Sequence, residues 1–335
     1  MSGQRIAVVG GGSIGVGWAV VFNRAGIETA LYEPDAERRK DVPGDLERRL
    51  RRLALGGVLN EDPAVVARRT RTVESLEETV VDVTHVQECA PESLELKREL
   101  FRRLDALVAP DVPLASSSSA LVTSAFASEL PGRQRCLVAH PGNPPYLLPV
   151  VELVPAPFTD AEVVERARTL FAAVGMSPVL VQRELEGFVF NRLQGALLRE
   201  AYCLVRDGIA SVDDVDRVVR DGLGRRWAAI GPFETAELNT RGGIEAHAEL
   251  LGPAYARMGA ERGQHDPWTP ELVARVAGEL HERLPPDRWE ERVSWRDEAL
   301  IALERARKES GLFEATAAAG RVAQVPQPDE HEGVT

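Results

Sequence analysis

The chain has 335 residues, of which 44% are hydrophobic and 27% charged, and this composition is typical of a globular protein long enough for two domains. Its formal net charge of −12 argues against nucleic acids and anionic membranes as partners, because both bind through basic patches. Three widely spaced cysteines, Cys89, Cys136 and Cys203, indicate reduced thiols in a cytoplasmic protein rather than a disulfide framework or a metal site.

The first predicted element is a short β-branched strand at residues 5–9, which leads directly into the sequence GGGSIG. Gly10, Gly12 and Gly15 fit the pattern GxGxxG, and an amphipathic segment follows at residues 16–25. A strand, a glycine-rich turn and a helix in this order are typical of a dinucleotide-binding fingerprint, in which the turn and the helix N-terminus face a pyrophosphate. The structural alternative is a glycine-rich turn that binds no nucleotide. A glycine motif so close to the N-terminus also argues against a signal peptide.

A second apolar run, residues 29–32, ends at Glu33. An acid about 20 residues beyond the fingerprint binds the ribose 2′-hydroxyl of NAD, whereas a base nearby can favour the 2′-phosphate of NADP. Arg38 follows Glu33, but the acid would repel that phosphate, so the pattern favours NAD. The alternative for Glu33 is an ordinary surface acid. The arginine-rich stretch at residues 35–55 indicates a solvated helix face with interleaved acids.

From the N-terminus to about residue 181 the pattern alternates between strands and helices, which predicts a doubly wound α/β sheet. A buried strand is expected at residues 80–86, a helix at 93–107 and a strand at 114–115. The serine run at residues 116–119 then follows a strand. Such a run is usually a polar loop or a helix cap, with a catalytic serine as the alternative.

A strand at residues 135–139 ends at His140, in a proline-rich and therefore rigid loop. The next strand, residues 150–154, carries the single acid Glu152 in an apolar run, where burial of the carboxylate requires a partner. Antiparallel pairing of these two strands would bring His140 and Glu152 together. In the alternative, Glu152 points to solvent from an edge strand and His140 caps a turn.

Beyond residue 186 helical patterns dominate. A long helix is expected at residues 187–206, with Asn191 near its start, where an asparagine is more often structural than catalytic. We expect an α/β domain over residues 1–185, an all-helical domain over 186–320 and a flexible tail over 325–335. Breaks between helices are expected at the sequences Gly252-Pro253 and His265-Asp266-Pro267-Trp268.

Several segments together resemble the 3-hydroxyacyl-CoA dehydrogenase superfamily, and within it the branch of lambda-crystallin and L-gulonate 3-dehydrogenase. They are, in chain order, GGGSIGVGWA, VQECAPESLELK, ASSSSAL, AHPGNPPYLLPVVELVPAPFT, GFVFNRL and DGLGRRWAAIGPFET. The resemblance extends over about residues 4–260. It implies a Rossmann-type domain that binds NAD, followed by a helical domain that forms a homodimer.

The resemblance also implies roles for individual residues. His140 matches the catalytic base and Glu152 the acid that pairs with it, while Ser119 and Asn191 match groups that contact the substrate. The implied cofactor contacts are Gly12, Ser13, Ile14 and Glu33 on the adenine side, with Glu92 and Lys97 at the nicotinamide ribose. Arg226 matches an arginine near the substrate cleft and the partner subunit.

Three positions depart from the pattern of this family. Glu33 stands where an aspartate is usual, which retains the carboxylate that NAD needs. Gly142 replaces a bulkier apolar residue after His-Pro, and we expect it to widen or loosen the pocket beside the catalytic loop. Arg225 adds a positive charge, which makes it a second candidate, with Arg226, to bind a substrate carboxylate.

These features predict a cytoplasmic enzyme that uses NAD to oxidise the 3-hydroxyl of a small hydroxy acid such as L-gulonate. A 3-hydroxyacyl-CoA and L-carnitine are the alternative substrates that the resemblance implies. A lens-crystallin-like protein that binds NAD without catalysis is the alternative from a different class. The set of Ser119, His140, Glu152 and Asn191 argues against it.

Overall fold

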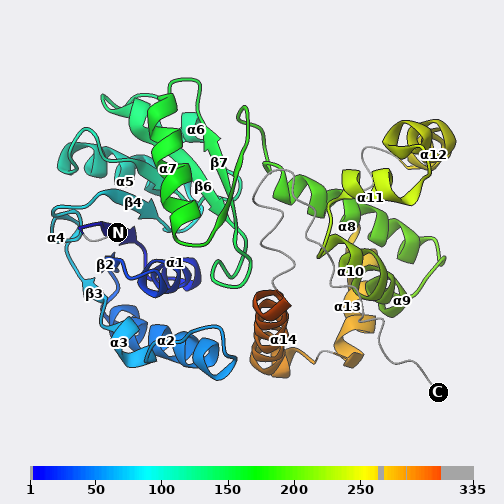
Figure 1. Ribbon diagram of the computed structural model, residues 1–335, viewed down its shortest axis with the longest axis horizontal. Coiled ribbons are helices and arrows are strands. Elements are labelled where there is room, and N and C mark those ends of the chain that lie inside the picture. The colour runs from blue at the N-terminus through cyan, green and yellow to red at the C-terminus, as the bar shows by residue number, and fades with distance from the viewer. Residues whose placement is uncertain (1–2, 263–267, 284, 311–335) are drawn as a thin grey trace, which may run out of the picture. The chain divides into compact units, whose positions relative to one another are not determined.

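The computed structural model describes residues 3–262, 268–283 and 285–310, and these form two compact units (Figure 1). The first unit comprises residues up to 195 together with 297–304. The second comprises residues 196–296 and the described residues from 305 onward. The predicted tail at residues 325–335 lies outside the described residues.

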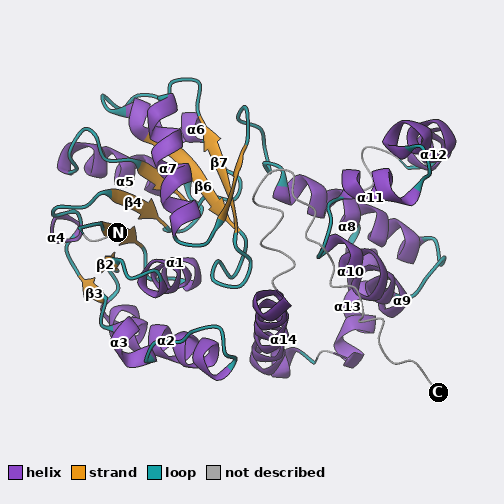
Figure 2. Ribbon diagram, viewed as in Figure 1, coloured by secondary structure: helices purple, strands orange, loops and turns teal. Residues whose placement is uncertain are grey.

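One sheet of eight strands organises the first unit, in the spatial order β3-β2-β1-β4-β5-β6-β7-β8 (Figure 2). All neighbouring strands are parallel except β6 and β7, which are antiparallel. The strand bounds are β1 Arg5–Val9, β2 Glu28–Tyr32, β3 Thr70–Val73, β4 His85–Glu88, β5 Leu114–Ser116, β6 Cys136–Pro141, β7 Val150–Pro155 and β8 Ser177–Leu180. This is the doubly wound α/β sheet that the alternating pattern predicts.

Helices cover both faces of this sheet and form a separate core on each face. One core is built around the stacked rings of Trp18 and Phe22 and the nearby ring of Phe171. The other includes Phe101 and Phe126, whose ring centroids are 4.5 Å apart. Each such buried side chain stabilises the fold by roughly 1.5–3 kcal/mol. The helix bounds are α1 Ser13–Arg24, α2 Ala36–Leu55, α3 Pro63–Ala67, α4 Leu76–Thr79, α5 Leu94–Leu107, α6 Thr123–Ala127 and α7 Ala161–Ala173.

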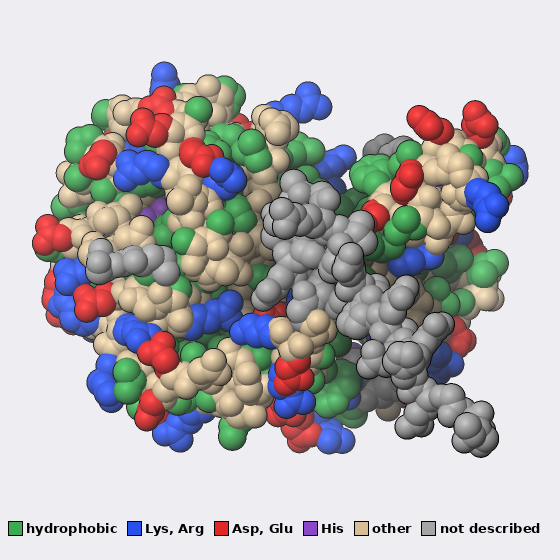
Figure 3. Space-filling model, viewed as in Figure 1, with side chains coloured by type: hydrophobic (Ala, Val, Ile, Leu, Met, Phe, Trp, Pro, Cys, Tyr) green, Lys and Arg blue, Asp and Glu red, His purple; other side chains and the backbone are tan. Residues whose placement is uncertain are grey.

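Local capping signals fix the starts of the predicted helices. The Asp35 side chain accepts a hydrogen bond from the Arg38 amide at the start of α2, and the Ser93 hydroxyl accepts one from Leu96 at the start of α5. The arginines of α2 are solvated as expected, since Arg48 and its neighbours pair with acids of the same helix. Figure 3 shows basic and acidic side chains interspersed over this face of the first unit.

The strand predicted at residues 80–86 is wrong in its bounds, because β4 begins only at His85. The preceding residues form the short helix α4, capped by Ser75, and a turn in which Asp82 has a φ of 53°. Val80 and Val83 are buried from this turn rather than from a strand, whereas Val81 is 50% exposed. β3, which the sequence did not predict, is a short edge strand in which three polar residues precede Val73.

The second unit is helical in its described residues. Helix α8 Phe190–Arg206 begins in the first unit and continues into the second, three residues later than the predicted start. The remaining α-helices are α9 Val212–Val218, α10 Gly224–Trp227, α11 Pro232–Asn239, α12 Gly243–Ala260, α13 Pro270–Arg283 and α14 Trp289–Ser310. None of the described helices is long and apolar enough to cross a membrane.

The break predicted at Gly252-Pro253 is wrong, because α12 continues through both residues. A proline inside a helix removes one backbone donor, and the hydrogen bonds before and after it can hold the helix together. Helix α2 likewise contains Pro43. Most of the second predicted break, at residues 265–268, lies outside the described residues.

Candidate active site

A cavity of about 680 Å³ opens at the carboxyl ends of β1 and β2 and beside the segment that follows β4. In a doubly wound sheet, ligands bind at this edge, where the order of the strands reverses. The cavity is lined by residues that the sequence predicts to bind a dinucleotide, among them Gly10, Gly12, Ser13, Ile14 and Glu33. The N-terminus of α1 is therefore available to an anion at the cavity wall.

The three fingerprint glycines meet three different steric requirements. A Cβ atom on Gly15 would lie 1.8 Å from the carbonyl oxygen of Gly10, so only glycine lets α1 pack this close to the turn. Gly10 has a φ of 115°, and a Cβ there would lie 2.8 Å from the carbonyl oxygen of Cys89. A Cβ on Gly12 would meet no atom within 4 Å, so its backbone is accessible to a phosphate. These residues fit the pyrophosphate of NAD.

Glu33 is buried at the end of β2, and both of its carboxylate oxygens are held by the backbone. Oε2 accepts a hydrogen bond of 2.8 Å from the Gly11 amide, and Oε1 accepts one of 3.0 Å from the Asp35 amide. Arg38 also lines the cavity, but its guanidinium donates to the Gly11 carbonyl and pairs with Asp45 at 2.9 Å. A carboxylate fixed in this place suits the ribose hydroxyls of NAD and opposes a 2′-phosphate.

Replacing Glu33 with alanine is expected to raise the KM for NAD by about ten- to a hundredfold, because hydrogen bonds to a charged group contribute roughly 1.5–3 kcal/mol. The ratio of kcat/KM for NAD to kcat/KM for NADP should fall, since Arg38 would remain without the opposing carboxylate. Steady-state kinetics with both cofactors measure this. Glu37→Ala, which removes an exposed acid of the following helix α2, is the control. An unchanged preference for NAD in Glu33→Ala would contradict the assignment.

His140 and Glu152 face each other across the antiparallel pair β6 and β7, where they are register partners. His140 Nδ1 lies 2.8 Å from Glu152 Oε2, and both side chains are buried. The rings of Phe188 and Phe190 lie beside the imidazole, with centroids 5.5 and 6.2 Å from it. The contact expected from strand pairing is present, so the alternative in which Glu152 points to solvent is wrong.

The second oxygen of Glu152 binds the start of helix α8. Oε1 accepts hydrogen bonds of 2.7 Å from the Val189 amide and 2.9 Å from the Phe190 amide. Burial favours a raised pKa for Glu152, but the hydrogen bonds from His140 and these two amides outweigh it and lower the pKa of this carboxyl below its usual value. Glu152 is therefore ionised at neutral pH and accepts a hydrogen bond from the N–H of His140 Nδ1, which leaves Nε2 as a hydrogen-bond acceptor.

The sequence did not reveal these main-chain donors. Gly187 and Phe188 have φ values of 75° and 47°, so the chain turns sharply before α8 and directs the next amides at Glu152. A left-handed Phe188 is costly for a bulky residue, and its fully buried ring beside His140 offsets that cost. The motif GFVFNRL was the available signal, but it gave no indication that its backbone binds a carboxylate.

Ser119 and Asn191 form a second pair. Asn191 Nδ2 donates a hydrogen bond of 3.1 Å to the carbonyl oxygen of Ser119, so the serine hydroxyl takes no part in this contact. Because Phe190 binds Glu152 and the adjacent Asn191 binds Ser119, the first residues of α8 hold both pairs. No contact in the described residues joins the Ser119 hydroxyl to His140, and the roles of Ser119 and Asn191 stay predictions.

Glu92 and Lys97 do not line the 680 Å³ cavity. Glu92 accepts hydrogen bonds from the Ser118 hydroxyl and from the Ala120 and Leu121 amides, and it thereby shapes the loop that carries Ser119. Lys97 is buried and pairs with Glu88 at 2.9 Å, with the Glu92 carboxylate 4.0 Å away. The predicted role of both residues at the nicotinamide ribose therefore stays a prediction.

The expectation that Gly142 widens the pocket is wrong. A Cβ atom on Gly142 would lie 2.8 Å from Leu148 Cβ and 3.0 Å from the Leu148 carbonyl oxygen, so the space beside this glycine is already filled. The loop between β6 and β7 folds back on itself here, and the Gly142 amide donates to the Val150 carbonyl at 3.0 Å. Gly142 thus allows the chain to pack closely next to His140.

Replacing Gly142 with alanine is therefore expected to lower the free energy of unfolding by about 1–3 kcal/mol, the usual cost of overpacking. Urea denaturation measures it. Gly44→Ala is the matched control, because a Cβ on Gly44 meets no atom within 4 Å and the residue lies inside α2. Alanine at position 44 should raise the free energy of unfolding by up to about 1 kcal/mol. Equal effects at the two positions would contradict the packing argument.

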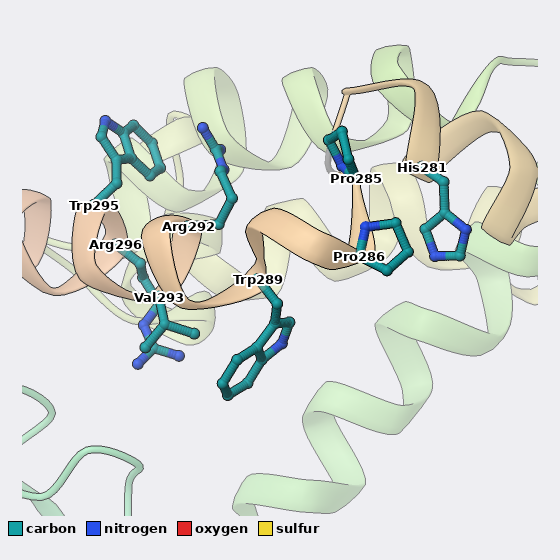
Figure 4. Close-up of a pocket in the computed structure, with 8 residues that line it drawn as sticks. All are labelled: His281, Pro285, Pro286, Trp289, Arg292, Val293, Trp295 and Arg296. Carbon is teal, nitrogen blue, oxygen red and sulfur yellow. The ribbon is translucent and has the colours of Figure 1, made fainter.

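Arg225 and Arg226 lie on α10, in the second unit. Their predicted contact with a substrate carboxylate stays a prediction. The same unit contains a separate hollow of about 490 Å³ between α13 and α14, lined by His281, Trp289 and Trp295 among others (Figure 4). The Arg292 guanidinium lies 4.4 Å from the ring centroid of Trp295. No group of three or more metal-ligating side chains lies together in the described ranges.

Comparison with known proteins supports a cofactor site at the first cavity. Residues 5–185 match the NAD-binding domain of 3-hydroxyacyl-CoA dehydrogenase, and residues 187–279 match the C-terminal domain of the same family. A lambda-crystallin homolog of Bos taurus is 40% identical over 89% of this chain and 94% of its own. An L-carnitine dehydrogenase of Pseudomonas aeruginosa is 35% identical over 90% of this chain and 92% of its own.

A solved structure shares the fold across almost the whole chain. It is 5-formyl-3-hydroxy-2-methylpyridine 4-carboxylic acid 5-dehydrogenase, an NAD+-dependent dismutase, with a TM-score of 0.79 and 24% identity. The match extends over 91% of this chain and 98% of that one.

Proposed function

Because the chain belongs to the 3-hydroxyacyl-CoA dehydrogenase family, we propose that it oxidises the 3-hydroxyl of a small hydroxy acid, with His140 as the base. The chain is an NAD-dependent oxidoreductase, and NAD, when bound, supplies the hydride acceptor. The observation that carries the proposal is the contact of a buried imidazole with an ionised carboxylate whose other oxygen is held by two backbone amides.

In this proposal, the Nε2 atom of neutral His140 accepts the hydroxyl proton of the substrate while hydride leaves the carbon that bears this hydroxyl. Glu152 retains the proton on Nδ1 and stabilises the imidazolium that forms, as in other carboxylate-histidine pairs. The rings of Phe188 and Phe190 limit access of water to the imidazole, which strengthens its interaction with the carboxylate. Ser119 and Asn191 would hydrogen-bond the reacting oxygen and set its angle to the nicotinamide.

The proposed substrate is a sugar acid like L-gulonate, which follows the resemblance to the lambda-crystallin branch. A 3-hydroxyacyl-CoA, suggested by the family, and L-carnitine, suggested by a relative of 35% identity, are the alternatives. Turnover of L-gulonate, L-carnitine and 3-hydroxybutyryl-CoA with NAD, followed by NADH absorbance, distinguishes them. The highest kcat/KM with L-gulonate is the expected result. A higher kcat/KM with L-carnitine or 3-hydroxybutyryl-CoA would identify that compound as the better candidate substrate. Turnover of none of the three would favour a crystallin-like protein that binds NAD without catalysis.

The second unit is the proposed dimerisation surface. Its helices expose large apolar side chains, including Ile209, Phe233 and Leu250, which are 69%, 78% and 69% exposed. Exposed apolar side chains in such numbers mark interaction surfaces. Light scattering on the purified chain should give the mass of a dimer, and a monomer at micromolar concentration would contradict the proposal. Cys89, Cys136 and Cys203 are free thiols, and the cytoplasmic setting stays a prediction.

A further inference from the structure

Gln87 is fully buried on β4, and its side chain reaches two segments beyond its own strand. Its Nε2 atom lies 2.7 Å from the Ser117 hydroxyl, just after β5, and 3.3 Å from the Ala139 carbonyl oxygen on β6. Ser117 precedes Ser119 by two residues, and Ala139 immediately precedes His140. One amide group therefore contacts both segments that carry the proposed catalytic groups.

The orientation of this amide is determined by its partners. A carbonyl oxygen only accepts hydrogen bonds, so the Gln87 nitrogen must face Ala139, and Oε1 faces His85 Nε2 at 3.2 Å. His85 Nε2 must then carry the ring proton, and its buried Nδ1 has no partner among the described residues. Burial lowers the pKa of His85 to about 4, so the ring is neutral at physiological pH. A flipped amide would place two acceptors against each other.

The Ser117 hydroxyl is also fixed from a second direction. Trp18 Nε1 donates to the same oxygen at 3.0 Å, so Ser117 Oγ accepts from both Trp18 and Gln87. On the opposite face of β4, Glu88 accepts a hydrogen bond of 2.5 Å from the Ser116 hydroxyl. Two consecutive residues of β4 thus bind two consecutive serines, the last residue of β5 and the first residue after it, and only Gln87 of these two also binds Ala139.

We propose that Gln87 is a positioning residue for hydride transfer, because by binding Ser117 and Ala139 at once it fixes the separation of Ser119 from His140. This inference rests on the roles of His140 and Ser119 proposed above. The Gln87 side chain acts through Ser117 and Ala139 and touches neither of the two catalytic candidates in the described contacts. A displacement of about 1 Å in such a support can lower the rate about a hundredfold.

The test is the Gln87→Met variant, which has a side chain of similar length and no polar donor. With L-gulonate, or whichever of the three alcohols the wild type oxidises fastest, kcat is expected to fall about ten- to a hundredfold. The Kd for NADH, measured by fluorescence, should stay within about threefold of wild type, because the glycine fingerprint is untouched. A large fall in kcat with an almost unchanged Kd for NADH is the result that a purely structural role of Gln87 would not produce.

Thr29→Val is the matched control, because it also removes a buried hydrogen-bonding side-chain group from the same sheet. Thr29 Oγ1 lies 2.7 Å from Thr70 Oγ1 and 3.1 Å from Asn23 Oδ1, on the amino-terminal half of β2. This variant should lose stability to urea, as Gln87→Met should, and retain the kcat of the wild type. Equal kcat values for wild type and Gln87→Met would overturn the proposal, and so would equal losses of kcat in Gln87→Met and Thr29→Val.

If Gln87→Met does not fold, Gln87→Asn takes its place, since the shorter amide cannot span both acceptors. A kcat close to wild type in that variant overturns the proposal equally. The His140→Gln variant separates this inference from the proposed function. Full activity of His140→Gln would reject the proposed function, whereas an inactive His140→Gln beside a fully active Gln87 variant would reject the positioning role alone.

Discussion

Replacing His140 with glutamine is expected to lower kcat by about 10²- to 10⁴-fold, the usual contribution of a general base. The amide of glutamine can still hydrogen-bond Glu152, so the contact between β6 and β7 is retained, but it cannot accept the proton of the substrate hydroxyl. Steady-state oxidation followed at the NADH absorbance measures kcat. The Kd for NADH should be unchanged, because His140 does not line the 680 Å³ cavity.

Cys136→Ser is the control for this prediction, since it changes another buried side chain at the start of the same strand β6. It should change the free energy of unfolding without a comparable loss of kcat. A kcat for His140→Gln within about tenfold of wild type, in a folded variant, would show that another group takes the proton.

Replacing Glu152 with glutamine is expected to lower kcat by up to about 10⁴-fold, as the change of carboxylate to amide does in the serine-protease triad. The structure supplies the reason. Oε1 faces two backbone donors, the Val189 and Phe190 amides, so the amide oxygen of glutamine must stay there and its nitrogen must face His140. Nδ1 of His140 would then accept a hydrogen bond, and its proton would move to Nε2, the atom that has to act as base.

The control for Glu152→Gln is Glu184→Gln, which alters a carboxylate that binds Ser124 through both oxygens. This change should leave kcat within about threefold of wild type, since the described hydrogen bonds of Glu184 go to Ser124 and not to His140. A Glu152→Gln variant that retains more than about a tenth of wild-type kcat would contradict the tautomer argument.

The ionisation of Glu152 should also make the free energy of unfolding depend on pH. Its pKa in the folded chain lies below the ordinary value of 4.5, so its ionised form stabilises the fold at pH values above 4.5. This stabilisation is lost as the pH falls through the lower pKa of the folded state. The difference in free energy of unfolding between wild type and Glu152→Gln should therefore be largest near neutral pH and shrink below about pH 4.5. Urea denaturation across this range measures it, and a difference independent of pH would contradict the assignment.

Short-range signals allowed much of the first unit to be predicted. The glycine fingerprint, the acid at Glu33 and the helical patterns at residues 35–55 and 93–107 each depend on residues close in sequence, and the turn and the helices lie where these signals place them. The contact of His140 with Glu152 could also be predicted, because an acid in a buried strand requires a partner and the preceding strand contained a histidine.

Features that depend on the backbone or on distant segments could not be predicted from the sequence. The amides of Val189 and Phe190 have no side-chain signature, and neither does the left-handed turn that directs them. Gly142 was interpreted as open space because its neighbour Leu148 fills that space only after the loop folds back. Gln87 is a buried polar residue of β4 and therefore needs a partner, but its two partners, Ser117 and Ala139, lie 30 and 52 residues further along the chain.

Helix α8 starts on the same carboxylate that orients His140, and it then continues out of the first unit. A single carboxylate therefore couples the position of that helix to the orientation of the imidazole. A displacement of the start of α8 would alter the hydrogen bonds of Glu152 and, through this one side chain, the proton affinity of His140.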